Sequence, residues 1–438
     1  MYCGFVETKP GAAMQDGRLV VDAMPGTLQD LQRAYGAAYD AGDYSRSLAI
    51  AKKAHAMAPD NALILMNLAV SHLRMDDFDE AIDFTLQALS RMPENFVAYD
   101  ALSHAYGEKG DVEAVREWGL KALTLRDRQF ARPPDTDCSR SPLPEPPAPK
   151  TRQHNIIAFS LFGNRARYCE TAILNAKAQA TVFPEWTCLF YVDETVPAVV
   201  LERLTAEGAH IRVVSGALKR WPPTMWRFAA ADVPGMHRVL FRDADSLISS
   251  RERILVDEWI SGDRQFHHIR DWHTHTELLH AGLWGMTAGA LPSMEAMVAR
   301  YLAKPLASAH FADQYFLREQ VWPHARRSLL AHDSLFGFHG GKPHPAGPAC
   351  GDDHIGANVA NGGFRIKVPV PDGTTILWEL HERIKAAQGA PDARRVCRYA
   401  SVTRGGEVMD HLPRPYLERL GRDMRVVLLP PPGWRAGS

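Results

Sequence analysis

The sequence predicts a multidomain protein in which an all-α domain of helical repeats precedes an α/β domain. Three observations indicate this fold class. Landmark residues recur every 34 positions between residues 42 and 122. A proline-rich stretch follows these repeats. Beyond Lys150 the apolar pattern changes from helical spacing to short strand-like runs that alternate with predicted helices.

The composition is that of an ordinary globular protein. The chain has 438 residues, of which 46% are hydrophobic and 23% charged, which is enough for two or three domains. Its 50 basic and 51 acidic side chains nearly balance, so the charge predicts neither a nucleic-acid partner nor an anionic membrane surface. No apolar run reaches the length of a transmembrane helix.

The cysteines and the N-terminal residues indicate the compartment. The cysteines form no C-x-x-C pair and no metal-finger spacing, which is typical of reduced thiols in the cytoplasm. Residues 1–26 have no basic segment followed by a long apolar core, so no secretion signal is predicted. We therefore expect a soluble cytoplasmic protein in which residues 1–26 form a disordered leader.

The repeat is visible at four kinds of position. Turn residues, aspartates, prolines and alanines each recur at a spacing of 34. The sets are Gly42, Asp76 and Gly110; Asp43, Asp77 and Asp111; Pro59 and Pro93; and Ala54, Ala88 and Ala122. Apolar residues between these landmarks follow helical spacing. Each unit is therefore predicted to be two helices joined by a tight turn, with proline ending the second helix.

This pattern resembles the tetratricopeptide repeat. The resemblance covers about Thr27 to Arg128 in three units, and the third unit has Asp127 where proline is usual. It implies a helical-repeat domain, predicted at 27–132, that docks a protein partner, the acceptor of a reaction or a second copy of the chain. The proline-rich stretch predicts a semi-rigid linker at 133–152.

Residues 153–370 are predicted to form the α/β domain. Buried strands are expected at 155–163, 187–194, 210–214 and 237–245, and helices at 167–183, 198–208 and 223–232. This alternation indicates a largely parallel sheet, in which ligands bind at the carboxyl ends of the strands. A C-terminal extension at 371–438 is expected to pack on this domain, with a helix at 374–387 and a closing strand that begins near Arg425.

Three Asp-x-Asp pairs occur in the sequence, and the predicted structure around each pair indicates a different role. The pair at 77–79 lies in the turn of the second repeat, where its carboxylates are expected to cap the following helix. The pair at 135–137 lies in the proline-rich linker. Asp243 and Asp245 directly follow a predicted buried strand, at the end where an α/β sheet binds its ligands. Context therefore selects this third pair as the candidate site.

Six segments of the α/β region form an ordered series. They are NIIAFSLFG, FYVDE, MWRF, VLFRDADS, HAGLWG and DQYFL, within about Asn155 to Val368. The series resembles the GT-A class of nucleotide-sugar-dependent glycosyltransferases, whose domain is Rossmann-like. The resemblance implies that Asp245 binds Mn²⁺ or Mg²⁺ and that Asp243 contacts the ribose, or the metal through water. A hard cation with carboxylate ligands can neutralise a diphosphate leaving group.

Further donor-binding roles are implied by the resemblance, and each has a structural alternative. Asp193 would hold the nucleoside, or it begins a turn. Trp226 would stack on the base or ribose and Arg227 would meet the diphosphate, or Trp226 lies in the core. Gly282 would let a sugar approach the backbone closely and the ring face of Trp284 would suit a pyranose, or the two residues belong to a bulge or tight turn.

The structural alternative for the Asp-x-Asp pair itself is local. Asp243 would pair with Arg242 or Arg238, and Asp245 would cap the turn that follows.

The catalytic acids and the last metal ligand are expected later in the chain. Asp313 and Asp271 are the candidate catalytic residues. The resemblance implies that an acidic residue near Asp313 faces the acceptor as general base, whereas a helix N-cap is the alternative for it. The resemblance also implies that His332 or His339 completes the cation shell.

A group of histidines allows a different enzyme class. A zinc-dependent hydrolase would use these residues together with Asp271, although no H-E-x-x-H signature is present. The histidines are His267, His268, His273, His275 and His280.

The preferred hypothesis is a metal-dependent glycosyltransferase. It would move a sugar from a nucleotide-diphospho-sugar donor to a glycan or protein acceptor. The alternative is an interaction scaffold whose α/β domain retains the fold without turnover. The presence of both Asp243 and Asp245 within the ordered series favours the enzyme.

Overall fold

The computed structural model describes residues 26–133, 155–306, 308–384 and 393–429 of the chain. These residues form two compact units. The first unit combines the N-terminal repeats with His268–His280 and Ala303–Pro348, and the second contains 155–267, Ala281–Leu302 and 349–429. The predicted leader and linker lie almost entirely outside the described residues.

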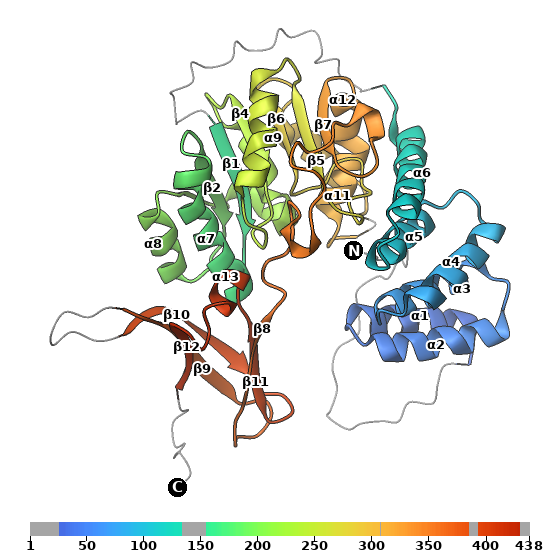
Figure 1. Cartoon of the computed structure of the whole chain (residues 1–438), viewed down its shortest axis with the longest axis horizontal. Coiled ribbons are helices and arrows are strands. Elements are labelled where there is room, and N and C mark those ends of the chain that lie inside the picture. Colours follow the sequence, from blue (N-terminus) through green and yellow to red (C-terminus); the bar gives the residue numbers. More distant parts are fainter. Residues whose placement is uncertain (1–25, 134–154, 307, 385–392, 430–438) are drawn as a thin grey trace. The chain divides into compact units, whose positions relative to one another are not determined.

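Six helices of the first unit form three consecutive pairs (Figure 1). They are α1 (Leu28–Asp40), α2 (Tyr44–Met57), α3 (Ala62–Leu73), α4 (Phe78–Arg91), α5 (Phe96–Glu108) and α6 (Val112–Phe130). The turn within each pair contains one residue with positive φ, namely Gly42 at 75°, Asp76 at 59° and Gly110 at 77°. These three positions are spaced by 34 residues, so the predicted helical repeat is confirmed.

The recurring aspartates begin the second helix of each pair. The side chain of Asp43 accepts the N–H of Arg46, and that of Asp111 accepts the N–H of Ala114. Asp77 occupies the same N-cap position but makes no side-chain capping bond. Its carboxylate instead lies 2.8 Å from Nδ1 of His72. Asp77 therefore lies at the N-terminus of α4, as expected, but its carboxylate contacts His72 and makes no capping hydrogen bond.

The repeat core explains why small residues recur. Ala69, Ala81 and Ala88 are all buried, and the last two belong to a cluster with Leu65 of α3. Alanine at these positions lets neighbouring helices approach closely, so each pair can bury one apolar face against the next.

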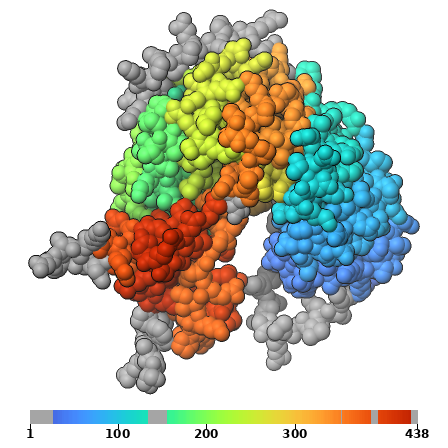
Figure 2. All heavy atoms as spheres, in the orientation of Figure 1, coloured from blue at the N-terminus to red at the C-terminus, as the bar shows by residue number. Residues whose placement is uncertain are grey.

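The third repeat packs against the other segments of the first unit (Figure 2). These segments contain α11 (Ala312–Phe316), the π-helical turn η3 (Leu317–Val321), α12 (Trp322–Ala325), β7 (Leu329–Asp333) and the 3-10 turn η4 (Phe338–Gly340). Asp127 of α6 accepts hydrogen bonds from Nε1 of Trp322 at 2.8 Å and from Nε of Arg326 at 3.0 Å. The missing proline thus lets α6 continue to Phe130 and present a carboxylate to α12.

A buried ion pair extends this packing inside the first unit. The guanidinium of Arg126 donates to both carboxylate oxygens of Asp100, at 2.8 and 2.5 Å, and to the carbonyl of Thr276 at 3.1 Å. The hydroxyl of Ser103 donates to the carbonyl of His273 at 2.7 Å. The third repeat and His268–His280 are therefore joined by buried polar contacts, which are costly to break.

The main sheet of the second unit has the order β3-β2-β1-β4-β6-β5. Its strands are β1 (Asn155–Leu161), β2 (Thr187–Val192), β3 (His210–Val213), β4 (Arg238–Phe241), β5 (Phe266–Arg270) and β6 (Trp284–Thr287). β1 is parallel to β2 and β4, β2 is parallel to β3, and β6 is antiparallel to β4. The last residues of β5 belong to the first unit, where β7 is its neighbour.

Helices alternate with these strands, as predicted. They are α7 (Ala166–Val182), α8 (Ala198–Ala206), the 3-10 helices η1 (Gly216–Arg220) and η2 (Pro223–Asp232), α9 (Ser250–Ser261) and α10 (Met294–Leu302). The element predicted as a helix at 223–232 is thus 3-10 rather than α, starting at two prolines. Among the described residues, no helix has the length and apolar character needed to cross a membrane.

The C-terminal part of the second unit is mostly β structure. It contains η5 (Gly351–Asp353), β8 (Gly363–Lys367), β9 (Thr375–Arg383), β10 (Ala393–Val402), β11 (Glu407–His411), α13 (Arg414–Leu417) and β12 (Met424–Leu429). The predicted helix at 374–387 is wrong over its described part, because Ile376, Trp378 and Leu380 are buried alternately with exposed Leu377. That period of two is typical of a strand.

A buried carboxylate connects this β structure to the α/β layer of the same unit. Glu170 of α7 receives two hydrogen bonds from the guanidinium of Arg203, at 2.7 and 2.8 Å. The hydroxyls of Tyr399 and Tyr416 donate to it at 2.7 and 3.3 Å. Because its charge is fully paired and hydrogen-bonded, Glu170 can be buried in this position.

Candidate functional site

Asp243 follows β4 and forms an ion pair with Arg227. Oδ1 of Asp243 lies 3.0 Å from Nη2 of Arg227, and the two side chains are 48% and 4% exposed. The main chain of Arg227 is held in place because its N–H donates to Oγ of Ser160 in β1, at 2.9 Å. A buried guanidinium therefore meets a half-exposed carboxylate at the carboxyl ends of two adjacent parallel strands.

The arginines expected as structural partners of Asp243 bind elsewhere. Nε of Arg242 donates to Glu252 at 2.6 Å, and its Nη1 donates to the carbonyl of Trp284 at 3.0 Å. Arg238 lies over the ring of Trp259. The alternative in which Asp243 pairs with Arg242 or Arg238 is therefore wrong, and the pairing observed is with the predicted diphosphate residue Arg227.

Asp245 lies deeper than Asp243. Burial, and secondly the negative charge of Asp243, raise the pKa of Asp245 to about 6, against the opposing charges of Arg167 and Arg227. Its Oδ2 accepts a hydrogen bond from Nδ2 of Asn358 at 2.8 Å. A partly buried carboxylate beside a second carboxylate is a place where a cation is electrostatically favoured.

Contacts from several elements fix the turn that contains Asp243 and Asp245. A Cβ at position 282 would overlap Oδ2 of Asp243, so Gly282 leaves room for that carboxylate. Buried Asn175 of α7 donates to the carbonyl of Ser246 at 2.7 Å and accepts the N–H of Ile248 at 2.9 Å. From the other side, the carbonyl of Asp245 accepts the N–H of Val359 at 3.0 Å. The turn is therefore held at both ends.

Cations also gather at the N-terminus of α7, which follows β1. Arg167 lies in the first turn of this helix, and its charge acts on Asp245. A helix N-terminus with nearby guanidinium groups favours an anion such as a phosphate. The site therefore combines two carboxylates suited to a cation with two arginines suited to a phosphate group.

The other strand-end aspartate has a local role. Oδ1 of Asp193 accepts hydrogen bonds from the N–H and hydroxyl of Thr195, at 3.1 and 2.5 Å. The hydroxyl of Thr195 also accepts the N–H of Gly163, at 2.6 Å. One oxygen of Asp193 thus begins a turn beside the end of β1, and its nucleoside-binding role stays a prediction.

The two predicted tryptophan platforms belong to the core. Trp226 is 4% exposed and donates from Nε1 to the carbonyl of Leu218 at 3.1 Å. Trp284 is fully buried in β6 and stacks on Phe241 with 4.2 Å between the ring centroids. Both rings are buried, which agrees with the core position given as the alternative for Trp226, and the donor-binding roles of the two residues stay predictions. The apolar surroundings of both rings explain their positions.

The predicted catalytic acids lie in the first unit. Asp271 is buried, and its Oδ1 accepts a hydrogen bond from the hydroxyl of Ser334 at 3.0 Å. Asp313 is buried in α11, where its Oδ1 accepts the N–H of Gln314 at 2.9 Å. Their assignment as catalytic acids stays a prediction.

The predicted late histidines also lie in the first unit. His332 is buried in β7, and His339 has a positive φ of 58° and packs on the ring of Trp322. Burial lowers the pKa of His339, which favours neutral imidazole. Within the second unit, the late residue that contacts Asp245 is Asn358, which sequence analysis missed because no local signal marks it.

The histidine-rich stretch does not converge on one centre. His267 stacks on Trp259, the N–H of His280 donates to Nε2 of His268 at 2.8 Å, and the N–H of Asp271 donates to Nδ1 of His275 at 3.0 Å. The two hydrogen bonds each occupy a ring nitrogen that a zinc site could use. A hydrolase centre built on Asp271 and this whole group therefore receives no support.

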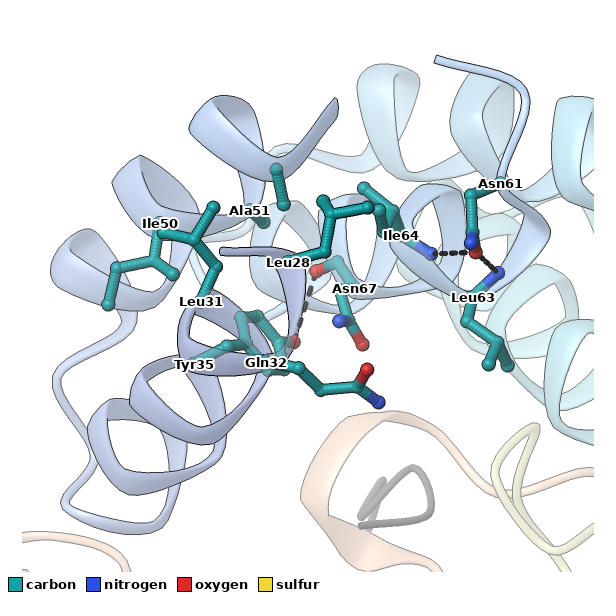
Figure 3. Close-up of a pocket in the computed structure, with 11 residues that line it drawn as sticks. Leu28, Leu31, Gln32, Tyr35, Ile50, Ala51, Asn61, Leu63, Ile64 and Asn67 are labelled. Atoms are coloured by element: carbon teal, nitrogen blue, oxygen red, sulfur yellow. Dashed lines mark hydrogen bonds between the residues drawn. The ribbon is translucent and has the colours of Figure 1, made fainter. Parts of the chain in front are cut away.

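A small pocket lies in the repeats, between α1, α2 and α3 (Figure 3). Apolar side chains, including Leu31 and Ile50, line one part of it, and Gln32 and Asn67 add amides. The hydroxyl of Tyr35 donates to the carbonyl of Asn67 at 3.1 Å. This pocket offers packing and hydrogen-bonding groups.

Comparison with known proteins identifies the repeats. The tetratricopeptide repeat model matches residues 38–105. These residues form a tetratricopeptide repeat region. No curated protein matches the chain.

Solved structures with similar folds are distant from the chain. The Arabidopsis OM64 TPR domain is 20% identical, with a TM-score of 0.22, and covers 22% of this chain and 81% of its own. The Sgt2 TPR domain from Aspergillus fumigatus is 19% identical, with a TM-score of 0.22, and covers 25% of this chain and 87% of its own. A Thermobaculum terrenum O-GlcNAc transferase mutant is 15% identical, with a TM-score of 0.27, and the match covers 49% of this chain and 45% of that one.

Proposed function

We propose that the second unit is a metal-dependent glycosyltransferase domain that uses a nucleotide-diphospho-sugar donor. The observation that supports the proposal is the juxtaposition of Asp243, Asp245 and Arg227 at the carboxyl end of β4. Parallel α/β sheets bind ligands at that edge. Two carboxylates and a guanidinium match the two components of a cation–diphosphate ligand.

The residues present fit a hard divalent cation. Asp245 is partly buried near Asp243, and its pKa is raised by burial and secondly by the charge of Asp243, both of which a cation would offset. Gly282 leaves room for the carboxylate of Asp243, which any larger side chain would displace. Asp243 and Asp245 would hold Mn²⁺ or Mg²⁺, which when bound would neutralise charge on the leaving diphosphate.

Three side chains would then orient the two carboxylates and bind the phosphate groups. Asn358 orients the carboxylate of Asp245 through its amide, and Arg227 orients that of Asp243. Arg167, at the N-terminus of α7, supplies positive charge for phosphate oxygens. Preorganised charges of this kind stabilise a developing negative charge without rearranging when the bond to the sugar breaks.

The repeats would dock a partner or an acceptor. The third repeat is already occupied within its unit by contacts such as Trp322 to Asp127 and Ser103 to His273. The surface available for a protein partner is therefore expected mainly on the first two repeats.

The test is a panel of nucleotide sugars offered to the full chain with and without Mn²⁺. We expect at least one donor to raise the melting temperature and release nucleotide only when Mn²⁺ is present. Asp245→Asn should abolish both signals. The matched control is Asp79→Asn, since Asp79 belongs to an Asp-x-Asp pair of identical spacing whose exposed carboxylate pairs with Lys109. The absence of metal-dependent binding for every donor, or full binding by Asp245→Asn, would exclude the proposed function.

A further inference from the structure

Three potential metal ligands meet in the first unit. His104 and Glu108 are four residues apart on α5, so they lie on one face of the helix. Oε1 of Glu108 lies 3.6 Å from Nε2 of His104 and 3.2 Å from Nε2 of His273. In the described part of the chain, this is the one group of three or more such side chains whose ligand atoms all lie within 4.8 Å of one another.

The separations fit a tetrahedral ion. Metal–ligand bonds of about 2.1 Å at the tetrahedral angle place ligand atoms about 3.4 Å apart. The two distances to Glu108, 3.6 and 3.2 Å, bracket that value. The imidazole rings of His104 and His273 lie side by side, with centroids 5.7 Å apart and planes inclined by 27°. Small rotations of the side chains would therefore direct all three ligands at one point.

The position of His273 is built into the fold. A Cβ at residue 107 would overlap the ring of His273, so Gly107 permits this ring to lie directly against α5. The hydroxyl of buried Ser103, one turn earlier, donates to the carbonyl of His273 at 2.7 Å. The ring of Trp272 contacts that of His273, with centroids 4.4 Å apart. Three neighbours thus hold the histidine beside Glu108.

The surroundings also suit an ion that enters from solvent. The side chain of His273 is 6% exposed and that of His104 is 19% exposed, whereas that of Glu108 is 40% exposed. One side of the group is therefore open, which leaves room for water as a fourth ligand. Glu108 is the last residue of α5, where the helix dipole also favours a positive charge.

We propose that His104, Glu108 and His273 form a zinc site that joins α5 of the third repeat to the segment His268–His280. Two imidazoles and one carboxylate suit a borderline ion such as Zn²⁺, whereas Mg²⁺ and Mn²⁺ prefer oxygen ligands. The site is therefore chemically distinct from the Asp243 and Asp245 pair. Its role is to stabilise the packing of the repeat, and it does not depend on the proposed transferase activity.

The experiment uses the full chain, stripped with a chelator and dialysed into metal-free buffer. Titration with ZnCl₂ by calorimetry should show one equivalent bound, and Co²⁺ should give the visible absorption bands of a tetrahedral site. His104→Gln, Glu108→Gln and His273→Gln should each weaken Zn²⁺ binding by about tenfold or more, at least the effect of losing an outer-shell partner. Zn²⁺ should raise the melting temperature of the parent chain more than that of Glu108→Gln.

Two controls separate this site from other sources of binding. His310→Gln removes an exposed histidine of the same unit and should leave Zn²⁺ affinity unchanged. Asp245→Asn should also retain the zinc equivalent. If His273→Gln fails to fold, Glu108→Gln decides the question, because its side chain is partly exposed and nearly the same in shape. No Zn²⁺ binding by the parent chain, an affinity unchanged from the parent in the three ligand variants, or loss of binding in Asp245→Asn would overturn the proposal.

Discussion

Asp243-Ala244-Asp245 and Asp77-Phe78-Asp79 share one spacing but lie in different surroundings. In the repeats, Asp77 lies beside His72 at 2.8 Å and the exposed Asp79 pairs with Lys109. After β4, Asp245 is partly buried near Asp243, and burial and secondly the charge of Asp243 raise the pKa of Asp245 to about 6. In the first pair the charges are stabilised by the hydrogen bond with His72, by the Lys109 ammonium and by solvent. In the second the charges oppose each other.

This difference shows that the spacing of two carboxylates carries little chemical information by itself. What matters is whether the fold buries the carboxylates together and surrounds them with groups that select a ligand. At the second pair those groups are Arg227 and Asn358, which come from distant parts of the sequence. The comparison can be tested by treating the two pairs in parallel.

The largest expected effect is on activity. Asp245→Asn should lower kcat/KM with the best nucleotide sugar by about 100-fold or more, because a bound cation supplies several kcal/mol of transition-state stabilisation. Asp79→Asn should leave kcat/KM unchanged within a factor of two or so, since exposed ion pairs contribute little. Steady-state assays at saturating Mn²⁺ measure both. An equal loss of kcat/KM in the two variants would show that the surroundings of the two pairs do not determine their roles.

The next effect is a difference in how stability depends on pH in the metal-free protein. The pKa of Asp245 is raised from 3.8 to about 6, so the folded state binds the extra proton and loses stability as the pH rises through that window. Asp245→Asn removes this cost. In buffer with EDTA at pH 7.5 the variant should therefore be more stable than the parent by at most about 3 kcal/mol, and the gain should vanish near pH 4.

Asp77 should behave in the opposite way. Hydrogen bonds with Glu80 and His72 lower its pKa below 3.8, so it stabilises the folded state above that pH and loses the contribution as the pH falls through the lowered value. Asp77→Asn should cost less than about 1 kcal/mol at pH 7.5, because the side chain is largely exposed. Urea unfolding at several pH values measures both variants. A shift of the same sign in both at pH 7.5 would contradict the assignment.

The third effect tests whether Asp243 needs glycine at position 282, where a side chain would overlap its carboxylate. Gly282→Ala should cost about 1–3 kcal/mol of stability, because the new methyl group overlaps Oδ2 of Asp243 and must displace it. Metal-dependent nucleotide binding should weaken in the same variant. Gly36→Ala is the matched control, since nothing lies within 4 Å of its added Cβ in α1, and it should stabilise the helix by about 0.5–1 kcal/mol. Thermal unfolding and nucleotide titration measure the two variants, and unchanged binding by Gly282→Ala would argue against a role for this space.

The sequence allowed the repeated turns and the strand–helix alternation to be predicted because both depend on local patterns. A positive φ at residues 42, 76 and 110 follows from one period, and β1, β2 and β4 follow from short apolar runs. The partners of the candidate site could not be predicted in this way. Asn358 is 113 residues from Asp245, and the contact depends on folding that no local pattern encodes.

Two further contacts show that tertiary packing decides what local patterns leave open. Trp284 was expected to face a sugar, but the antiparallel pairing of β6 with β4 places its ring on Phe241 in the core. Asp127 occupies the position at the end of the third unit where the repeat pattern usually has proline. Its carboxylate accepts hydrogen bonds from Trp322 and Arg326, 195 and 199 residues away. Departures from a repeat pattern can thus mark positions used for packing on another segment.

The smallest expected effect concerns the turn that precedes Asp77. Asp76 has a φ of 59°, in the left-handed region where Gly42 and Gly110 occupy the equivalent positions of the other repeats. A side chain in this region is strained, although aspartate tolerates it better than most residues. Asp76→Gly should therefore change stability by less than about 1 kcal/mol, in the stabilising direction.

The matched change in the first repeat should have the opposite sign. Gly42→Ala introduces a Cβ at a φ of 75°, and it should destabilise the chain by about 1–2 kcal/mol although nothing lies within 4 Å of the new atom. Chemical denaturation of both variants at pH 7.5 compares the two turns directly. If Gly42→Ala proved as stable as the parent, the 34-residue register would not impose the same backbone on each repeat. The contacts with His72 and Lys109, and not the backbone conformation of the repeat, would then explain why the carboxylates of Asp77 and Asp79 lie where they do.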